Sequence, residues 1–269
     1  EIIREKQRQL GFCKMISVVI SYCSNDKPFI QPLLNECKKF SNDIIIVSTN
    51  HFLDGKYDEE LQDLTQEDVK HIIYPWEVDK NPKFWHNHNR FLGLQQAQKS
   101  YVLFLDADEI PDGKIMLDFL NSGLHLSIPI ISFECYWYFR EATFRALTTE
   151  RCGVLYNRGY LTEELIYHPM ERWSYEMTQT PRLDKYTFRN EIIMHHFSWV
   201  RTKEQMLKKV KSWAHQGDKQ WVSLIEEEFK YSFKGRDFVH NYKFIDVENI
   251  FKIDIYGRQE TTDPSSICT

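Results

Sequence analysis

The sequence lacks several features that would place it in a familiar class at once. Its six cysteines form no CxxC pair and no metal-ligand spacing, which excludes a zinc module and favours reduced core thiols in a cytosolic environment. No apolar run approaches the roughly 18 residues of a membrane span, and no signal peptide is visible. A formal net charge of −5 gives no electrostatic reason to bind nucleic acid. We therefore expect a cytoplasmic protein, soluble or peripheral to a membrane, without a nucleic-acid partner.

The sequence does have a hydrophobic content of 42%, which is enough for a substantial core, and a high aromatic share of 14%. Surplus aromatic side chains suit a stacking or sugar-binding cleft, although they also fill cores. A length of 269 residues suits one large domain or a domain with an appendage.

Strand and helix patterns alternate over the first part of the chain. Apolar spacing indicates helices at residues 28–40 and at about 85–99. The apolar, β-branched segments between them predict strands that are buried on both faces. Repeated strand–helix units favour a parallel, doubly wound α/β sheet. The predicted strands are residues 15–21, 43–48, 69–74 and 101–105.

The second half of the chain has a different pattern. An aromatic-rich strand is predicted at residues 130–139 and a shorter strand at 191–196. Thr202 and Gln205 have the spacing of a capping box that opens a helix. A further helix is predicted at about 220–233. The sheet is therefore expected to be followed by a helical segment.

The most informative segment is YVLFLDADEIP, residues 101–111. Its apolar run ends in three carboxylates, which belong to Asp106, Asp108 and Glu109. Because like charges at the end of a buried strand repel one another and lose hydration, a divalent cation is expected to compensate them. The carboxyl ends of strands in an α/β sheet are also where ligands bind. A solvated acidic turn is the alternative.

This motif belongs to an ordered series of segments that resembles family-2-type glycosyltransferases of the GT-A fold. The nearest branch is that of the lipopolysaccharide-core glucosyltransferases, and the resemblance covers roughly residues 15–214. The matching segments are MISVVI at 15–20, LDADE at 105–109, VLYNR at 154–158, HPME at 168–171 and HFSW at 196–199, followed by Lys208 and Lys209.

The resemblance implies a GT-A, Rossmann-like, mostly parallel sheet flanked by helices, with a C-terminal helical extension. It also implies that a sugar moves from a nucleotide sugar, with a UDP-sugar preferred, to a hydroxyl of a glycan acceptor, with inversion in a single displacement. Such an enzyme would also suit a large DNA virus that encodes its own glycosylation. The implied division is a leader or remnant at 1–14, a catalytic domain at 15–200 with a nucleotide-sugar half (15–112) and an acceptor half (113–200), a helical extension at 201–256 and a polar tail at 257–269.

In this resemblance the acidic motif becomes a metal site for the diphosphate of the donor. A Mn²⁺ or Mg²⁺ ion that bridges the phosphates would stabilise the leaving group as a Lewis acid. Asp108 is expected to contact the metal, and Asp106 to be shared among the metal, its waters and the ribose. Glu109 is expected either to support a ligand or to be a surface charge.

Two adjacent histidines lie in a later predicted strand. On an alternating strand, one of His195 and His196 points inward and the other outward. The resemblance selects His196 to complete the metal site or to touch the diphosphate, and a core histidine is the alternative for either residue. Lys209, in the next helix, is expected to reach the diphosphate or to be an ordinary solvated lysine.

The remaining donor contacts are expected at the ends of the first two strands and in the helix before the fourth. The second strand departs from the family pattern because it ends in Ser48-Thr49-Asn50 instead of an aspartate, and Asp54 is a candidate for a shifted remnant. Arg90 is expected either to face a phosphate of the donor or to be an ordinary helix arginine. The expected donor-binding residues are Ser21, Tyr22, Asn25, Ser48, Asn89, Arg90, Asp106, Ala107 and Lys209.

An inverting transferase needs a general base that takes the proton of the acceptor hydroxyl. The resemblance points to the HPME segment, where the family's His-Glu pair is split, and so to Glu171. The fallback bases are Glu134, Glu150 and Glu176. The aromatic candidates for stacking on the acceptor are Trp137, Tyr138 and Trp173. For Trp137 and Tyr138, core packing is the alternative.

Other functions stay open at this point. A retaining transferase of the same fold also has a metal-site histidine late in the chain. A sugar nucleotidyltransferase has a related sheet but needs a glycine-rich, basic loop after the first strand, and SYCSNDKP at residues 21–28 contains no glycine. A non-catalytic glycan-binding protein is disfavoured because Asp106, Asp108 and His196 are all present.

Overall fold

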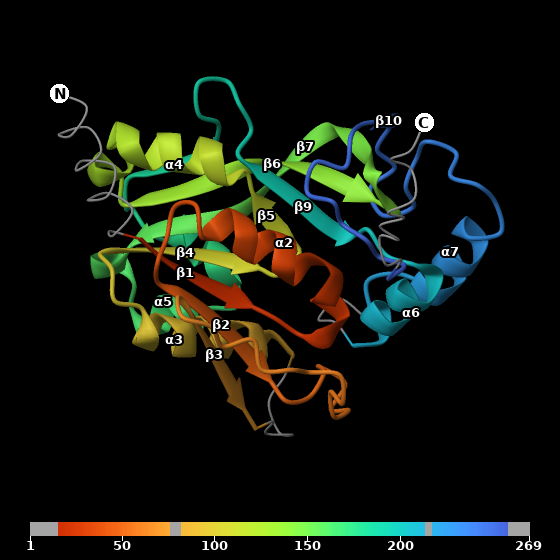
Figure 1. The fold of residues 1–269 in the computed structure, drawn as a ribbon, viewed down its shortest axis with the longest axis horizontal. Coiled ribbons are helices and arrows are strands. Elements are labelled where there is room, and N and C mark those ends of the chain that lie inside the picture. Colours follow the sequence, from red (N-terminus) through yellow and green to blue (C-terminus); the bar gives the residue numbers. More distant parts are fainter. Residues whose placement is uncertain (1–15, 76–81, 213–216, 258–269) are drawn as a thin grey trace, which may run out of the picture.

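One ten-stranded sheet runs through the computed structural model, which describes residues 16–75, 82–212 and 217–257 (Figure 1). Its first half is parallel and has the strand order β3-β2-β1-β4. All residues of β1 and β2 are buried, as the continuous apolar sequence predicts for strands covered on both faces. These strands are β1 (Ile16–Ser21), β2 (Ile44–Thr49), β3 (Val69–Tyr74) and β4 (Tyr101–Asp106), in agreement with the four predicted.

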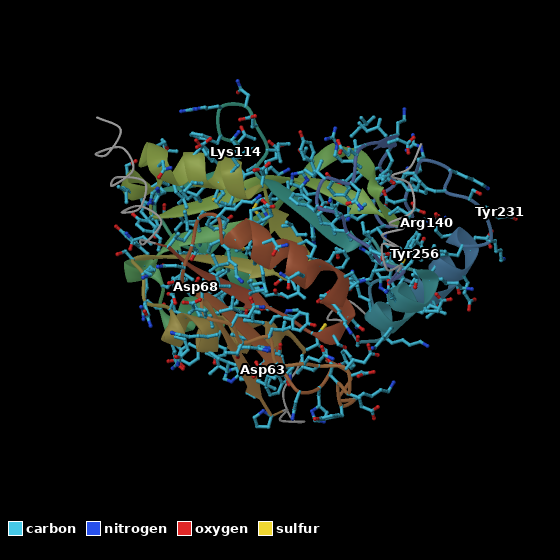
Figure 2. The ribbon with its side chains drawn as sticks, in the orientation of Figure 1. Asp63, Asp68, Lys114, Arg140, Tyr231 and Tyr256 are labelled. Atoms are coloured by element: carbon cyan, nitrogen blue, oxygen red, sulfur yellow. The ribbon has the colours of Figure 1, made fainter. Side chains whose placement is uncertain are left out.

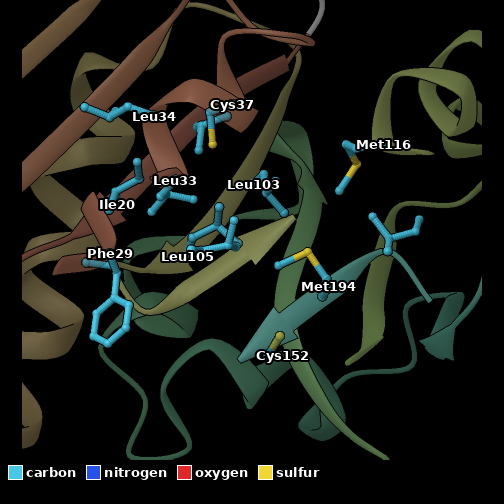
Figure 3. Close-up of a cluster of buried hydrophobic side chains, with 14 of the residues drawn as sticks. Ile20, Phe29, Leu33, Leu34, Cys37, Leu103, Leu105, Met116, Cys152 and Met194 are labelled. Carbon is cyan, nitrogen blue, oxygen red and sulfur yellow. The ribbon is translucent and has the colours of Figure 1, made fainter. Parts of the chain in front are cut away.

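Alternate residues of the central strands face two different hydrophobic clusters. Ile20 of β1 faces the cluster formed with α2 and α4, and Val19 faces the cluster on the side of α3. Figure 3 shows the first cluster, in which Leu33, Leu103 and Met116 come from α2, β4 and α4. The helices are α2 (Lys27–Cys37), α3 (Pro82–Gln96) and α4 (Gly113–Ser122), and a 3-10 turn, η2 (Ser24–Asp26), precedes α2.

The second half of the sheet is mostly antiparallel. β7 pairs with β4, β6 pairs with β7, and β9 runs parallel to β6 and carries β5 at its other side. The short strand β5 begins at Glu109, which pairs in register with His196 of β9. The sheet therefore brings the acidic motif beside a histidine from far along the chain. These strands are β5 (Glu109–Pro111), β6 (Ile130–Phe139), β7 (Glu141–Asn157), β8 (Arg182–Tyr186), β9 (Met194–Trp199) and β10 (Phe244–Asp246).

The C-terminal segment packs on the antiparallel end of the sheet. The predicted capping box is present, because the Thr202 side chain accepts from the Gln205 backbone and Gln205 caps in return. The predicted helix at 220–233 ends earlier, at Glu228, and β10 joins β7 where only helix was expected. The short elements of this half are η3 (Leu124–Ser127), η4 (Arg158–Tyr160), α5 (Glu163–Ile166), η5 (Glu171–Met177), α6 (Lys203–Lys211) and α7 (Trp221–Glu228).

The α/β fold class predicted from the sequence is confirmed: a mostly parallel, Rossmann-like sheet is flanked by helices and followed by a helical extension. The predicted leader at 1–14, with Met15, and the tail beyond Gly257 lie outside the described residues. Charged and polar side chains such as Asp63 and Lys114 extend from the periphery (Figure 2). None of the helices in the described ranges is both long and apolar enough to cross a membrane.

Candidate active site

A single cavity of about 810 Å³ opens where the carboxyl ends of β1, β2 and β4 meet β9 and α6. It is continuous from the turn after β1 to the segment that follows α7. Residues from both halves of the sheet line it, so the cavity joins the two predicted halves of the catalytic domain. Its walls include Ser21, Tyr22, Asn25, Thr49, Asn89, Asp106, Asp108, Glu150, Glu171, His196, Arg201, Lys209 and His240.

The acidic motif lies in the middle of this cavity and is fixed by the backbone on both sides. The Ala107 N–H donates to the Ser21 carbonyl over 3.0 Å, and the Asp108 carbonyl accepts from the Phe197 N–H over 2.8 Å. Ala107 itself is fully buried in the core and does not line the cavity. Asp106 precedes Ala107 and Asp108 follows it, and both aspartates line the cavity.

Cations from three places converge on Asp108. The Lys209 ammonium lies 3.1 Å and the Arg201 guanidinium 3.2 Å from its Oδ2, and His196 Nε2 lies 3.7 Å from its Oδ1. Burial alone would raise the pKa of Asp108, but Lys209, His196 and Arg201 hold it at about 2. Asp108 is therefore ionised at neutral pH. The solvated-turn alternative for the motif is excluded, since this residue is only 5% exposed.

Asp106 is held by two arginines. Arg90 and Arg172 each place a guanidinium nitrogen 3.3 Å from one of its oxygens. Burial would raise the pKa of Asp106, but these two arginines keep it well below its usual range. Arg90 does not line the cavity; it is buried behind Asp106 and also bonds Glu171 over 3.2 Å. Arg90 therefore contacts two carboxylates, and its contact with phosphate stays a prediction.

Glu109 is not a surface charge, because it is completely buried. Both of its oxygens accept from Arg172 over 2.5 Å, and one also accepts from the Asp106 N–H over 3.0 Å. Glu109 therefore supports the motif from behind through Arg172. Arg172 was not predicted from the sequence, where it follows Glu171 and resembles an ordinary surface arginine.

The two histidines of β9 divide as the alternation predicts. The Tyr138 hydroxyl hydrogen-bonds His195 Nδ1 over 2.8 Å, and burial lowers the pKa of His195 to about 4, so it is a neutral core residue. His196 points to Asp108. Burial would lower the pKa of His196, but the Cys135 thiol and the Asp108 carboxylate raise it to about 9. At neutral pH the side chain adds a further positive charge to this part of the cavity.

Arg201 is the main residue of the site that the sequence did not reveal. Its side chain is 1% exposed and donates to Asp26 and Asp108. Its Nε and Nη1 atoms are buried without a hydrogen-bond partner among the described residues. A buried N–H group without a partner costs free energy, so this guanidinium is suited to an anionic ligand. The only signal in the sequence was its position just after HFSW.

The end of the cavity beside β1 and β2 carries two buried hydroxyls, Ser21 Oγ and Thr49 Oγ1, which have no partner within the described part of the chain. Ser48, also predicted here, does not line the cavity: its hydroxyl donates to the Tyr22 carbonyl over 2.8 Å, so its donor contact stays a prediction. Tyr22 and Asn25 line this end as predicted.

Two aspartates near this end of the cavity have other roles. Asp54 lies in a smaller neighbouring cavity, so it does not replace the missing aspartate of β2. Asp58 is buried and accepts from the Ser24 N–H over 3.0 Å, which fixes the turn after β1. In the helix on the other wall, Asn89 lines the cavity and accepts from the Tyr74 hydroxyl over 2.6 Å.

Two of the four candidate bases reach the cavity. Glu171 lines it and has a left-handed φ of 53°, a conformation that costs free energy in a non-glycine residue. Burial would raise the pKa of Glu171, but Arg90 and other neighbouring cations lower it. Glu150 lines the far end. Glu134 accepts from Thr149 and Glu176 pairs with Arg151, and neither lines the cavity.

The aromatic candidates are mostly core residues. Trp137 borders the cavity but is only 1% exposed, and Tyr138 is buried against His195. Trp173 lines the cavity with the guanidinium of Arg151 over its ring at 4.3 Å. Core packing therefore accounts for Trp137 and Tyr138.

The donor atoms near the motif fit a divalent cation in combination with a substrate. The described residues contain no group of three or more metal-ligating side chains poised together. Mg²⁺ and similar ions, however, commonly take one or two carboxylates and complete their shell with substrate phosphates and water. Asp108 and His196 lie side by side, and Asp106 faces the same cavity. The two carboxylates suit Mn²⁺ or Mg²⁺, and His196 could act as a further ligand only in its neutral form.

Comparisons with known proteins give likenesses of fold. No protein-family model and no curated protein matches the chain. Among solved structures, Staphylococcus aureus TarS 1–349 gives a TM-score of 0.42 at 15% identity over 81% of this chain and 73% of that chain. The same TarS piece in complex with UDP-GlcNAc gives 0.40 at 14% over 81% and 74%. A putative glucose-1-phosphate thymidylyltransferase from Bacillus anthracis, in complex with a sucrose, gives 0.39 at 8% over 64% and 88%. These likenesses carry no functional argument, and the placement nearest the lipopolysaccharide-core branch stays a prediction.

Proposed function

We propose that the chain is a metal-dependent glycosyltransferase that moves a sugar from a UDP-sugar to a hydroxyl of a glycan. The observation that carries the proposal is the set of groups that line one cavity. Two unpartnered hydroxyls, Asp108 with three cationic side chains around it, and the carboxylate of Glu171 all border it. A nucleoside, a diphosphate and a reacting hydroxyl call for these three kinds of group.

The nucleoside is assigned to the end beside β1 and β2. Ser21 Oγ and Thr49 Oγ1 can exchange hydrogen bonds with the polar edge of a base or with a ribose. Leaving such groups unsatisfied in a buried position is costly, so a ligand that satisfies them is favoured. Tyr22 and Phe52 supply the apolar walls that a planar base requires.

The diphosphate is assigned to the middle of the cavity. Arg201 offers its unpartnered N–H groups, and Lys209 and His196 add positive charge close to Asp108. These groups stabilise the charge that develops on the leaving diphosphate. Mn²⁺ or Mg²⁺ would be held by Asp108, with Asp106 nearby, and would act there as a Lewis acid. His196 would join these ligands only after giving up its proton, because a metal is bound by the neutral imidazole. With the donor bound, Lys209 would share its ammonium group between Asp108 and the donor phosphates.

Glu171 is the proposed base. Its low pKa keeps it ionised at neutral pH, and Arg90 holds it at a fixed position relative to Asp106. The acceptor oxygen forms a bond to the anomeric carbon while the bond from that carbon to the diphosphate oxygen breaks, and the hydroxyl proton passes to the Glu171 carboxylate. This single displacement inverts the anomeric configuration, which NMR of the product would report.

A panel of UDP- and GDP-sugars, tested for hydrolysis and transfer with Mn²⁺ present, tests the proposal. Asp108→Asn should reduce turnover of the active donor at least 100-fold, because several kcal/mol of leaving-group stabilisation are lost at about 1.4 kcal/mol per factor of ten. Asp118→Asn, an exposed change of the same chemistry, is the control. Circular dichroism should be unchanged in both. Full activity of Asp108→Asn would overturn the proposal.

A further inference from the structure

The far end of the cavity contains a carboxylate that the proposed reaction does not use. Glu150 of β7 lies 3.3 Å from Nε2 of His240, which belongs to the segment after α7. Burial, together with the charge of the Glu150 carboxylate, raises the pKa of the nearby Tyr242 to about 12. Tyr242 is therefore a neutral donor at neutral pH. Two side chains from another part of the chain thus orient one carboxylate beside the cavity.

The turn that carries these two side chains is itself built around a buried acid. Asp237 is 4% exposed, and its carboxylate accepts from the backbone N–H groups of residues 240, 241 and 242 over 2.5, 3.3 and 2.8 Å. The rings of His240 and Tyr242 stack with centroids 5.0 Å apart, and His240 also meets the ring of Trp137 at 5.1 Å. The position of His240 and Tyr242 is therefore set by a rigid local structure.

The charge at this end of the cavity favours a neutral ligand. Arg151 pairs with Glu176, and Lys219, which keeps its charge, donates to the Val239 carbonyl over 2.5 Å. Glu150 is faced by His240 and lies near Tyr242, and no arginine or lysine pairs with it among the described residues. A phosphate or carboxylate would be repelled by the Glu150 carboxylate itself. Hydroxyl groups, in contrast, donate readily to a carboxylate oxygen.

We propose that Glu150, oriented by His240 and Tyr242, binds the hydroxyls of a neutral sugar in the acceptor glycan. The proposal rests on the proposed function, because it assigns the acceptor to the end of the cavity opposite the nucleoside. Glu150 is a binding residue in this assignment, and proton transfer stays with Glu171. The segment beyond α6 would then complete the acceptor site that the catalytic domain begins.

Transfer kinetics with two classes of acceptor test the proposal. Neutral methyl hexosides and methyl pentosides are compared with glucuronic acid and glucose 6-phosphate, with the donor that the enzyme turns over. Glu150→Gln should raise KM for the neutral acceptor about 10- to 100-fold, the range expected when a hydrogen bond to a charged group is lost. The kcat should change little, and the calorimetric affinity for UDP should stay the same. Tyr242→Phe should raise KM in the same direction by a smaller factor, and Glu141→Gln, an exposed change on the same strand, should have no effect.

The outcomes separate this proposal from the proposed function. A loss of kcat in Glu150→Gln with an unchanged acceptor KM overturns it, as does an unchanged KM in both Glu150→Gln and Tyr242→Phe. Preference of the wild type for the anionic sugars, or turnover of donor with no transfer to any neutral sugar, also overturns it. Failure of the wild type to bind UDP or to consume any nucleotide sugar instead contradicts the proposed function itself.

Discussion

Replacing Arg172 with alanine should destabilise the protein more than an ordinary substitution, because it leaves a buried carboxylate without its partner. Glu109 is fully buried, and both of its oxygens accept from Arg172 over 2.5 Å. Removal of one partner from a buried ion pair typically costs about 3–5 kcal/mol. Asp106 loses a second contact at 3.3 Å in the same variant.

The assay is urea unfolding at neutral pH, followed by circular dichroism. Arg172→Ala should lower the free energy of unfolding by about 3–5 kcal/mol. Arg151→Ala is the matched control, since Arg151 and Glu176 form a pair in which the side chains are 33% and 30% exposed. Pairs that are partly exposed, as this one is, contribute about 0–1 kcal/mol. Adding Glu109→Gln to Arg172→Ala removes the stranded charge and should recover much of the loss.

Two results would refute this reasoning. In one, Arg172→Ala costs no more than Arg151→Ala. In the other, the double variant is as unstable as Arg172→Ala alone, which would mean that the loss comes from packing and not from the buried charge of Glu109.

Three further predictions concern the base, a core histidine and a helix contact. Glu171→Gln should lower kcat about 10²- to 10⁴-fold with UDP affinity retained, and an unchanged kcat would exclude Glu171 as the base. Burial lowers the pKa of His125 to about 4. The unfolded chain therefore takes up a proton near pH 6.5, and the native state does not. The free energy of unfolding should then fall from pH 6.5 toward pH 4 by up to about 1.4 kcal/mol per pH unit. Denaturant titrations at several pH values should show a smaller slope for His125→Gln. Gly93→Ala places a Cβ 2.2 Å from a methyl of Val19 and should cost about 1–3 kcal/mol in the same titrations; no loss would show that α3 can shift.

The parallel half of the fold could be predicted because its strands are continuous apolar segments with helices between them. Local pattern also predicted that His195 and His196 face opposite sides of their strand, whereas the choice of His196 for the site came from the resemblance. The same rule applies to the second strand, which ends at Thr49, one residue later than predicted. Thr49 lines the cavity, and its neighbour Ser48 does not.

The partners of the carboxylates could not be predicted, because they depend on long-range register. Glu109 meets Arg172 only after η5 has folded back onto the acidic motif. Arg201 reaches Asp26 and Asp108 only because β9 ends beside the turn after β1. The sequence also gave no sign of the turn around Asp237, whose effect depends on three consecutive backbone N–H groups.

Calorimetric titration of UDP with and without Mn²⁺ tests the central claim most directly. If the cavity is a site for a nucleotide diphosphate and a metal, UDP should bind in the presence of Mn²⁺, much more weakly after chelation, and weakly in Asp108→Asn under both conditions. No binding of UDP with Mn²⁺ present, or equal affinity with and without the metal, would contradict it.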